Sequence, residues 1–206
     1  MKNKFLIIVL SIFLCTSCSK KAQKIESKII TDNPTSESII NKYVEYSIAK
    51  GSHYCDKSSY TTIKSGQLIF KVKFDSSSIY QTSQESNQTD INKLFGFSDN
   101  NAAHHEYSAR FGWRWSNNSL HLFAYVYNKS VMIFKEIGTV QIGEENTCAL
   151  KVAGDKYKFT LNDKSITIPR ESTTALAEGY KLWPYFGGNE TAPHTISIWI
   201  MELPGS

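Results

Sequence analysis

Residues 67–74, QLIFKVKF, alternate apolar and polar side chains with a period of two. In a β-strand such alternation buries one face and leaves the other in water. Similar runs recur along the chain between turn-forming segments such as SNNS, AGDK and NDK. A chain with this pattern has to pack strand faces against one another, so it is constrained to form sheets.

Further strands are predicted at residues 111–115, 120–127, 147–152, 157–161, 165–168 and 195–201. Helical segments are scarce. Residues 38–50 fit either a short helix or an edge strand, and residues 172–178 fit a helical turn. Many short strands without an internal repeat favour an all-β fold, a concanavalin A-like β-jelly-roll sandwich with one concave sheet. The concave face of such a sandwich can bind a polymer.

The N-terminus combines a short basic start with an apolar run that is too short to cross a bilayer, so residues 1–17 are predicted to be a signal peptide. Small residues before Cys18 resemble the bacterial lipobox, whose cysteine is lipidated; a plain cleaved signal is the alternative. Residues 18–37 are polar and predict a flexible tether, and residues 38–206 predict one domain. We expect a monomeric bacterial lipoprotein, anchored in the cell envelope through Cys18 on the periplasmic side or the cell surface.

Composition and motifs argue against several function classes. A net charge of +4 without a basic run gives no sign of nucleic-acid binding. No cysteine and histidine cluster has metal-ligand spacing, and no motif indicates a cofactor. Cys55 and Cys148, the thiols left after the signal and the lipidation site, either form a disulfide or stay reduced, with Cys148 packed as a small apolar residue.

Residues 107–115, YSARFGWRW, present two different surfaces on one predicted strand. One face is apolar, and the other carries Ser108, Arg110, Gly112 and Arg114. The expected hairpin partner, SLHLFAYVYN, directs its aliphatic residues into the core and leaves His121, Tyr125 and Tyr127 beside the arginine face. An ordinary solvated face is the alternative, but this register is poor in Lys, Glu and Thr. Because rings stack on sugars and arginine pairs with carboxylates, the pattern predicts a sugar-binding groove.

Three segments in order, NKLFGFS at 92–98, SAR at 108–110 and YVY at 125–127, resemble the alginate- and glucuronan-cleaving jelly-roll polysaccharide lyases. The resemblance implies cleavage of a uronate polymer by β-elimination. It implies that Arg110 neutralises the uronate carboxylate and that Tyr125 or Tyr127 is the acid or base. The pKa of a tyrosine, about 10 in its ordinary state, would then have to be lowered by the charges of Lys93 and Arg110. His121 is a rival base.

Further substrate contacts are expected from other polar side chains of these strands and the loop before them: Ser108, His121, Asn92, Arg114 and His105. The effect of Arg114 should be the weaker one, since it lies near a turn. The groove register of the central strands holds no paired carboxylates, which argues against a glycoside hydrolase. Two further alternatives stay open: a glycan-binding lipoprotein without catalysis, and a structural envelope protein whose groove binds no sugar.

Overall fold

The computed structural model describes residues 42–205, so the predicted signal peptide, the tether and Cys18 lie outside the described residues. The described residues belong to one compact unit, Ile39–Ser206. None of the helices in this part of the chain has the length and apolar character needed to cross a membrane.

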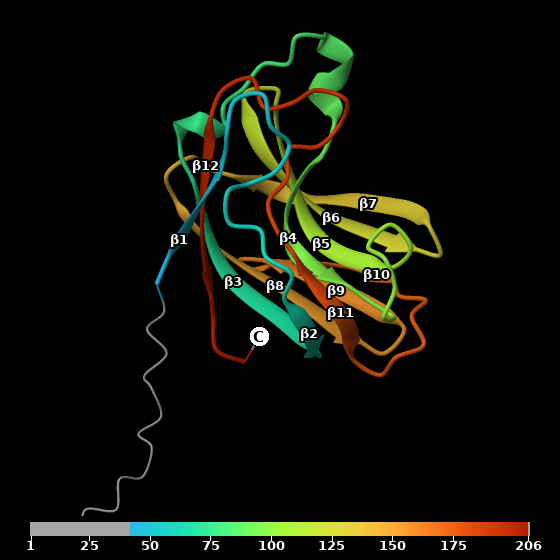
Figure 1. Ribbon diagram of the computed structural model, residues 1–206. Coiled ribbons are helices and arrows are strands. Elements are labelled where there is room, and N and C mark those ends of the chain that lie inside the picture. The colour runs from blue at the N-terminus through green and yellow to red at the C-terminus, as the bar shows by residue number, and fades with distance from the viewer. Residues whose placement is uncertain (1–41, 206) are drawn as a thin grey trace, which may run out of the picture. The chain divides into compact units, whose positions relative to one another are not determined.

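Two antiparallel sheets of six strands each form the unit, and Figure 1 shows β4–β7 in one layer and β3, β8 and β9 in the other. The first sheet contains, in spatial order, β1 (Val44–Ile48), β12 (Ile196–Glu202), β3 (Gln67–Phe74), β8 (Glu145–Ala153), β9 (Lys156–Leu161) and β10 (Lys164–Pro169). The second contains β2 (Thr62–Ser65), β11 (Ala177–Leu182), β4 (Asn92–Ser98), β5 (Ser108–Ser116), β6 (Ser119–Asn128) and β7 (Val131–Val140). The predicted all-β jelly-roll sandwich is therefore confirmed.

Helix is limited to two short 3-10 segments in the described residues, η1 (Ser76–Ser78) and η2 (Glu85–Thr89). Of the two structures considered for residues 38–50, the described part adopts the edge strand, β1. The helical turn predicted at 172–178 is wrong. Residues 174–176 form a bend and Ala177 begins β11, because Ala177 and Glu178 pair with β2.

Aromatic side chains join the two sheets. Phe70 of β3 contacts Phe95 of β4 and Phe111 of β5, with ring centroids 5.2 and 5.5 Å apart, and Phe111 in turn contacts Phe159 of β9 at 5.2 Å. All four rings are fully buried. Edge-to-face contacts of this kind add to the stabilisation that comes from burying apolar area.

Cys55 and Cys148 are both free and buried, so the structure has the reduced alternative and not the disulfide. Cys148 is completely enclosed, and burial raises the pKa of its thiol. A neutral thiol in an apolar environment packs as a small hydrophobic group and is a poor nucleophile.

A buried ion pair ties the end of β4 to the segment that precedes β11. Arg170 donates from Nε to Asp99 Oδ2 at 2.8 Å, and Tyr157 donates to the same oxygen at 2.5 Å. Burial alone would raise the pKa of Asp99, but the hydrogen bonds from Arg170, Tyr157 and the Asn100 backbone outweigh it and hold that pKa below its usual range. The pair therefore contributes stability above pH about 4, which is lost as the pH falls through the lowered pKa.

We expect Arg170→Met to lower the free energy of unfolding by about 3–5 kcal/mol, because it leaves the Asp99 carboxylate buried and unpaired. Lys57→Met is the matched control, since it removes the cation of an exposed pair with Asp56 and should cost about 0–1 kcal/mol. Urea unfolding measures both. Equal losses in the two variants would contradict the structural importance of the buried pair.

Candidate functional site

The β5–β6 hairpin sets the geometry of the site. Ser116 and Ser119 pair across a two-residue turn whose Asn117 and Asn118 both have positive φ, a conformation that asparagine tolerates. In this register Arg110 lies opposite Tyr125, and Ser108 lies opposite Tyr127. The predicted register is confirmed: the aliphatic residues of β6 are buried in the core, and the tyrosines share a face with Arg110.

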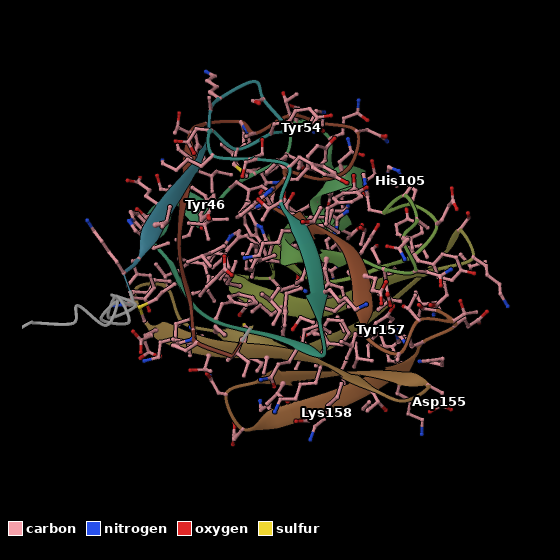
Figure 2. The ribbon with its side chains drawn as sticks, turned by 60° about the horizontal axis from the view of Figure 1, so that its bottom comes forward. Tyr46, Tyr54, His105, Asp155, Tyr157 and Lys158 are labelled. Atoms are coloured by element: carbon pink, nitrogen blue, oxygen red, sulfur yellow. The ribbon has the colours of Figure 1, made fainter. Side chains whose placement is uncertain are left out.

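A hollow of about 550 Å³ lies over this face, and we call it the first hollow. Its lining from the central strands and the loop before β5 is Lys93, His104, His105, Arg110, Tyr125 and Tyr127, and its other wall includes Tyr54, Tyr60, Tyr180, Lys181, Trp183 and Tyr185. Figure 2 shows Tyr54 and His105 on the opposite side of the molecule from Lys158, which belongs to β9 of the other sheet, and from Asp155, which lies in the turn before β9. A volume of this size is typical of ligand-binding sites.

Arg110 is a buried cation that forms no ion pair with any residue in the range 42–205. Its side chain is 7% exposed, and no group in the described part of the chain bonds its Nε. Burial lowers the pKa of Arg110 to about 10, and the guanidinium carbon lies 5.7 Å from the centre of the Tyr125 ring. Gly96 on β4 makes room for it, since a Cβ there would overlap the Cβ of Arg110. A buried guanidinium is unfavourable until an anion pairs with it, so this position is suited to a carboxylate.

Lys93 lies near the ring of the same tyrosine, Tyr125. Its Nζ donates to the carbonyl oxygen of Ile91 at 2.6 Å and lies 4.7 Å from the Tyr125 ring centre. Burial, and then the positive charge of Arg110, lowers the pKa of Lys93 to about 8. A substantial fraction of this amine is therefore neutral at mildly alkaline pH.

Burial raises the pKa of Tyr125, whereas it lowers the pKa of Lys93. The pKa of Tyr125 is raised first by burial and then by the neighbouring Tyr127, and the field of Arg110 only partly opposes this rise. The expectation that the nearby cations lower the pKa of the site tyrosine is therefore wrong for Tyr125, because desolvation of the phenolate dominates. The hydroxyl of Tyr125 donates to Met132 Sδ at 2.8 Å, and its ring is edge-on to that of Tyr127 at 5.8 Å.

The loop before β5 supplies the two histidines of the first hollow. Ser108, itself buried, donates to the carbonyl oxygen of His104 at 2.7 Å and so positions this loop and does not face the hollow. The His104 ring bonds the Tyr180 hydroxyl at 2.9 Å, and burial, Arg110 and His105 lower the pKa of His104 to about 4. The His105 ring meets Tyr127 edge-on, with centroids 5.6 Å apart.

Three more of the predicted contact residues, in addition to Ser108, lie outside the first hollow. Asn92 is buried, donates to the Tyr80 hydroxyl and accepts from the backbone of Gly187. Arg114 donates to the carbonyl oxygen of Thr89 and stacks over Phe123. His121 bonds Glu136 and the carbonyl oxygen of Ser116. Asn92 and His121 thus have partners within the protein, and Arg114 has one for Nη1, whereas its buried Nε has none among the described residues.

Sequence reasoning missed the wall opposite Arg110. Tyr180, Trp183 and Tyr185 come from β11 and the segment after it, and exposed Tyr54 and Tyr60 come from the segment before β2. The high density of aromatic residues in YKLWPY, at 180–185, was the available signal. The sequence alone did not place this aromatic segment in the site, because β11 pairs with β4, a strand that is far away in the sequence.

The charged residues that line the first hollow are all basic. The lining contains Lys93, Arg110 and Lys181 but, among the described residues, no aspartate or glutamate. Lys181 is paired with Glu202 at 2.5 Å, which leaves Lys93 and Arg110 without a carboxylate. No group of three or more potential metal ligands occurs in residues 42–205. The positive charge of this lining is suited to recognition of an anion.

Comparisons with known proteins agree with this architecture. No protein-family model and no curated protein sequence matches the chain. Among solved structures, the alginate lyase AlyC3 superimposes with a TM-score of 0.53 and 9% identity, over 79% of this chain and 74% of that one. The alginate lyase from Klebsiella pneumoniae gives 0.51 and 13%, over 68% of this chain and 58% of its own. The marine PL7 alginate lyase AlyA1 from Zobellia galactanivorans gives 0.50 and 12%, over 78% and 75%.

At these identities the likeness defines the scaffold. The chain has the jelly-roll fold shared by these polysaccharide lyases, and the first hollow lies on the outer face of its second sheet.

The ammonium group of Lys93 should titrate with a midpoint near pH 8, whereas exposed lysines titrate at about 10.4. Carbon-detected NMR of the lysine ε-carbons measures this. Arg110→Met should move the Lys93 midpoint upward, because it removes a repelling charge. Arg114→Met is the control, since Arg114 lies against Phe123 outside the first hollow, and it should leave the midpoint unchanged. A parent midpoint near 10.4 would contradict the buried, charge-repelled environment.

Proposed function

We propose that the protein binds an acidic, uronate-containing polysaccharide in the first hollow and cleaves it by β-elimination. The observation that carries the proposal is Arg110, a buried guanidinium whose Nε has no partner among the described residues. A uronate carboxylate would supply the missing anion, and the surrounding tyrosine rings would pack on the apolar faces of the sugar.

The structural neighbours support the same class of ligand. Three of them are described as alginate lyases, and AlyC3 has been solved in complex with dimannuronate. The substrate of this chain is proposed from its own site, because identities near 10% carry the fold and not the activity.

In the proposed reaction, Arg110 pairs with the carboxylate and stabilises the charge that develops when the proton on the adjacent carbon is removed. A base takes that proton, the electron pair of the C–H bond forms the new C=C bond, and the bond to the glycosidic oxygen breaks. The departing oxygen takes a proton from an acid. Tyr125 suits the acid because its raised pKa keeps it protonated, and Lys93 suits the base because its lowered pKa makes it partly neutral.

A glycan-binding protein without catalysis is the second candidate. The hydroxyl of Tyr125 already donates to Met132, and the amine of Lys93 already donates to the Ile91 carbonyl. A site in which both contacts persist after the ligand binds would hold a uronate on Arg110 and transfer no proton.

Tyr125→Phe should reduce cleavage about 100-fold or more while the Kd stays nearly unchanged, because the ring remains and only the transferable proton is lost. Turnover is measured by the absorbance of the unsaturated uronate product and binding by calorimetry, with polymannuronate and polyglucuronate as ligands. Tyr43→Phe is the control: Tyr43 bonds Glu145 on the opposite sheet, so both quantities should be retained.

Arg110→Lys should raise the Kd about tenfold or more, because a point charge cannot replace the planar, two-pronged donor. Arg114→Lys is the matched control and should bind as the parent does. Binding by the parent without any product would select the glycan-binding function. Unchanged binding and cleavage in both the Arg110 and the Tyr125 variants would refute the proposed site.

For the location, we propose a bacterial cell-envelope lipoprotein anchored to the membrane through Cys18, on the evidence of the N-terminal sequence alone. Cys18→Ala should block lipidation and move the protein from the membrane fraction to the soluble fraction after expression in a bacterial host. Immunoblotting of the two fractions tests this. An unchanged distribution would favour a plain signal peptide or another means of attachment.

A further inference from the structure

A second hollow, also of about 550 Å³, adjoins the first. Its lining includes Thr62, Lys64, Asn101 and Glu178, and it shares Tyr60 and Tyr180 with the first hollow. The rings of these two tyrosines lie 5.3 Å apart. The tyrosine pair is therefore the boundary that a chain molecule would cross in passing from one hollow to the other.

Strand pairing places both hollows on one face of the second sheet. Leu182 pairs with Gly96, which pairs with Arg110, so all three lie on the same face. Tyr180 and Glu178 lie two and four residues before Leu182 on β11 and therefore share its face. Figure 1 shows β2 and β11 beside β4 in this layer. The surface from Arg110 to Glu178 is thus continuous.

The two hollows differ in charge. The first presents Lys93 and Arg110 without a carboxylate. In the second, Lys64 pairs with Glu178 Oε1 at 3.0 Å, and Asn101 Nδ2 donates to Glu178 Oε2 at 3.2 Å, so the lysine is neutralised. These hydrogen bonds, from Lys64 and then Asn101, hold the pKa of Glu178 below its usual range, and the group remains a carboxylate at neutral pH.

A sugar in the second hollow would meet acceptors and an aromatic surface. A second uronate there would bring its carboxylate close to Glu178, and this like-charge approach is unfavourable. The hydroxyl groups of a neutral sugar can instead donate to Glu178. Tyr60 is 80% exposed, so one side of its ring is open to stack on a sugar face.

We propose that the ligand is an acidic heteropolysaccharide, with a uronate in the first hollow and a neutral sugar farther along the same chain in the second. This inference rests on the proposed function, because Arg110 has to hold a uronate for a later sugar of the chain to reach the second hollow. It narrows the substrate from any uronate polymer to one that contains both uronate and neutral sugars.

Calorimetry of the full chain with four matched probes tests the inference: a dimer and a tetramer of glucuronate, and a dimer and a tetramer in which glucuronate alternates with glucose. The alternating tetramer should bind about tenfold more tightly than its dimer, since one added stacked and hydrogen-bonded sugar is worth about 1.4 kcal/mol. The glucuronate tetramer should gain less than about twofold over its dimer, because repulsion by Glu178 offsets the added contact.

Glu178→Gln should remove this difference. The substituted side-chain amide keeps an oxygen that can accept from Asn101 but frees the charge of Lys64, so the glucuronate tetramer should gain about tenfold in affinity. Glu171→Gln is the matched control, because Glu171 pairs with Lys129 at 2.9 Å outside both hollows, and it should change neither tetramer.

The outcomes separate the two proposals. If the glucuronate tetramer gains as much over its dimer as the alternating one does, and Glu178→Gln has no effect, the inference is wrong while uronate binding stands. If none of the four probes binds, or if Arg110→Lys binds them all as the parent does, the proposed function itself fails.

Discussion

Strand β5 has one face in the core between the sheets and the other face toward the first hollow, so its register determines both the packing of the core and the position of the candidate site. Phe111 and Trp113 are fully buried between the sheets, while Arg110 and Ser108 alternate with them on the other face. A shift of one residue would place the guanidinium in the aromatic core and the rings in the hollow. The two-residue asparagine turn to β6 and the close packing of Gly96 against Arg110 both oppose such a slip. The site is thus specified by the same contacts that specify the core.

Two buried arginines differ in whether the described part of the protein supplies their counterion. Arg170 donates to Asp99, Thr174 and Ser172, and its counterion is equally buried. Arg110 is buried to a similar degree but has the aromatic rings of the first hollow around it and no carboxylate in its lining. An ion pair that is complete within the protein holds two segments together. A buried cation that has no counterion within the protein retains its capacity to bind an external anion.

The sequence contained enough information to predict the fold and the centre of the site. Period-two alternation predicted most strands of the sandwich, and the pairing of residues 107–115 with 119–128 was sufficient to place Arg110, Tyr125 and Tyr127 on one face. Strand β7 and the helical-turn segment at 172–178 were not predicted correctly, because the edge strand β7 is half exposed and the other segment is extended by non-local pairing. Because it also depends on non-local pairing, the wall of the first hollow formed by Tyr54, Tyr60 and Trp183 was not predicted from the sequence.

Protonation was the part of the site that residue types alone predicted least well. A cation beside a phenol suggests a lowered pKa, yet the pKa of Tyr125 is raised and that of Lys93 is lowered. Burial explains both, since it disfavours the charged form of each group: the phenolate of the tyrosine and the ammonium of the lysine. An acid has to keep its proton until the leaving oxygen needs it, and a base has to be free of its proton beforehand. One desolvated environment therefore shifts the two neighbours toward the opposite protonation states that the proposed elimination requires, while Arg110 retains the positive charge that would bind the proposed uronate.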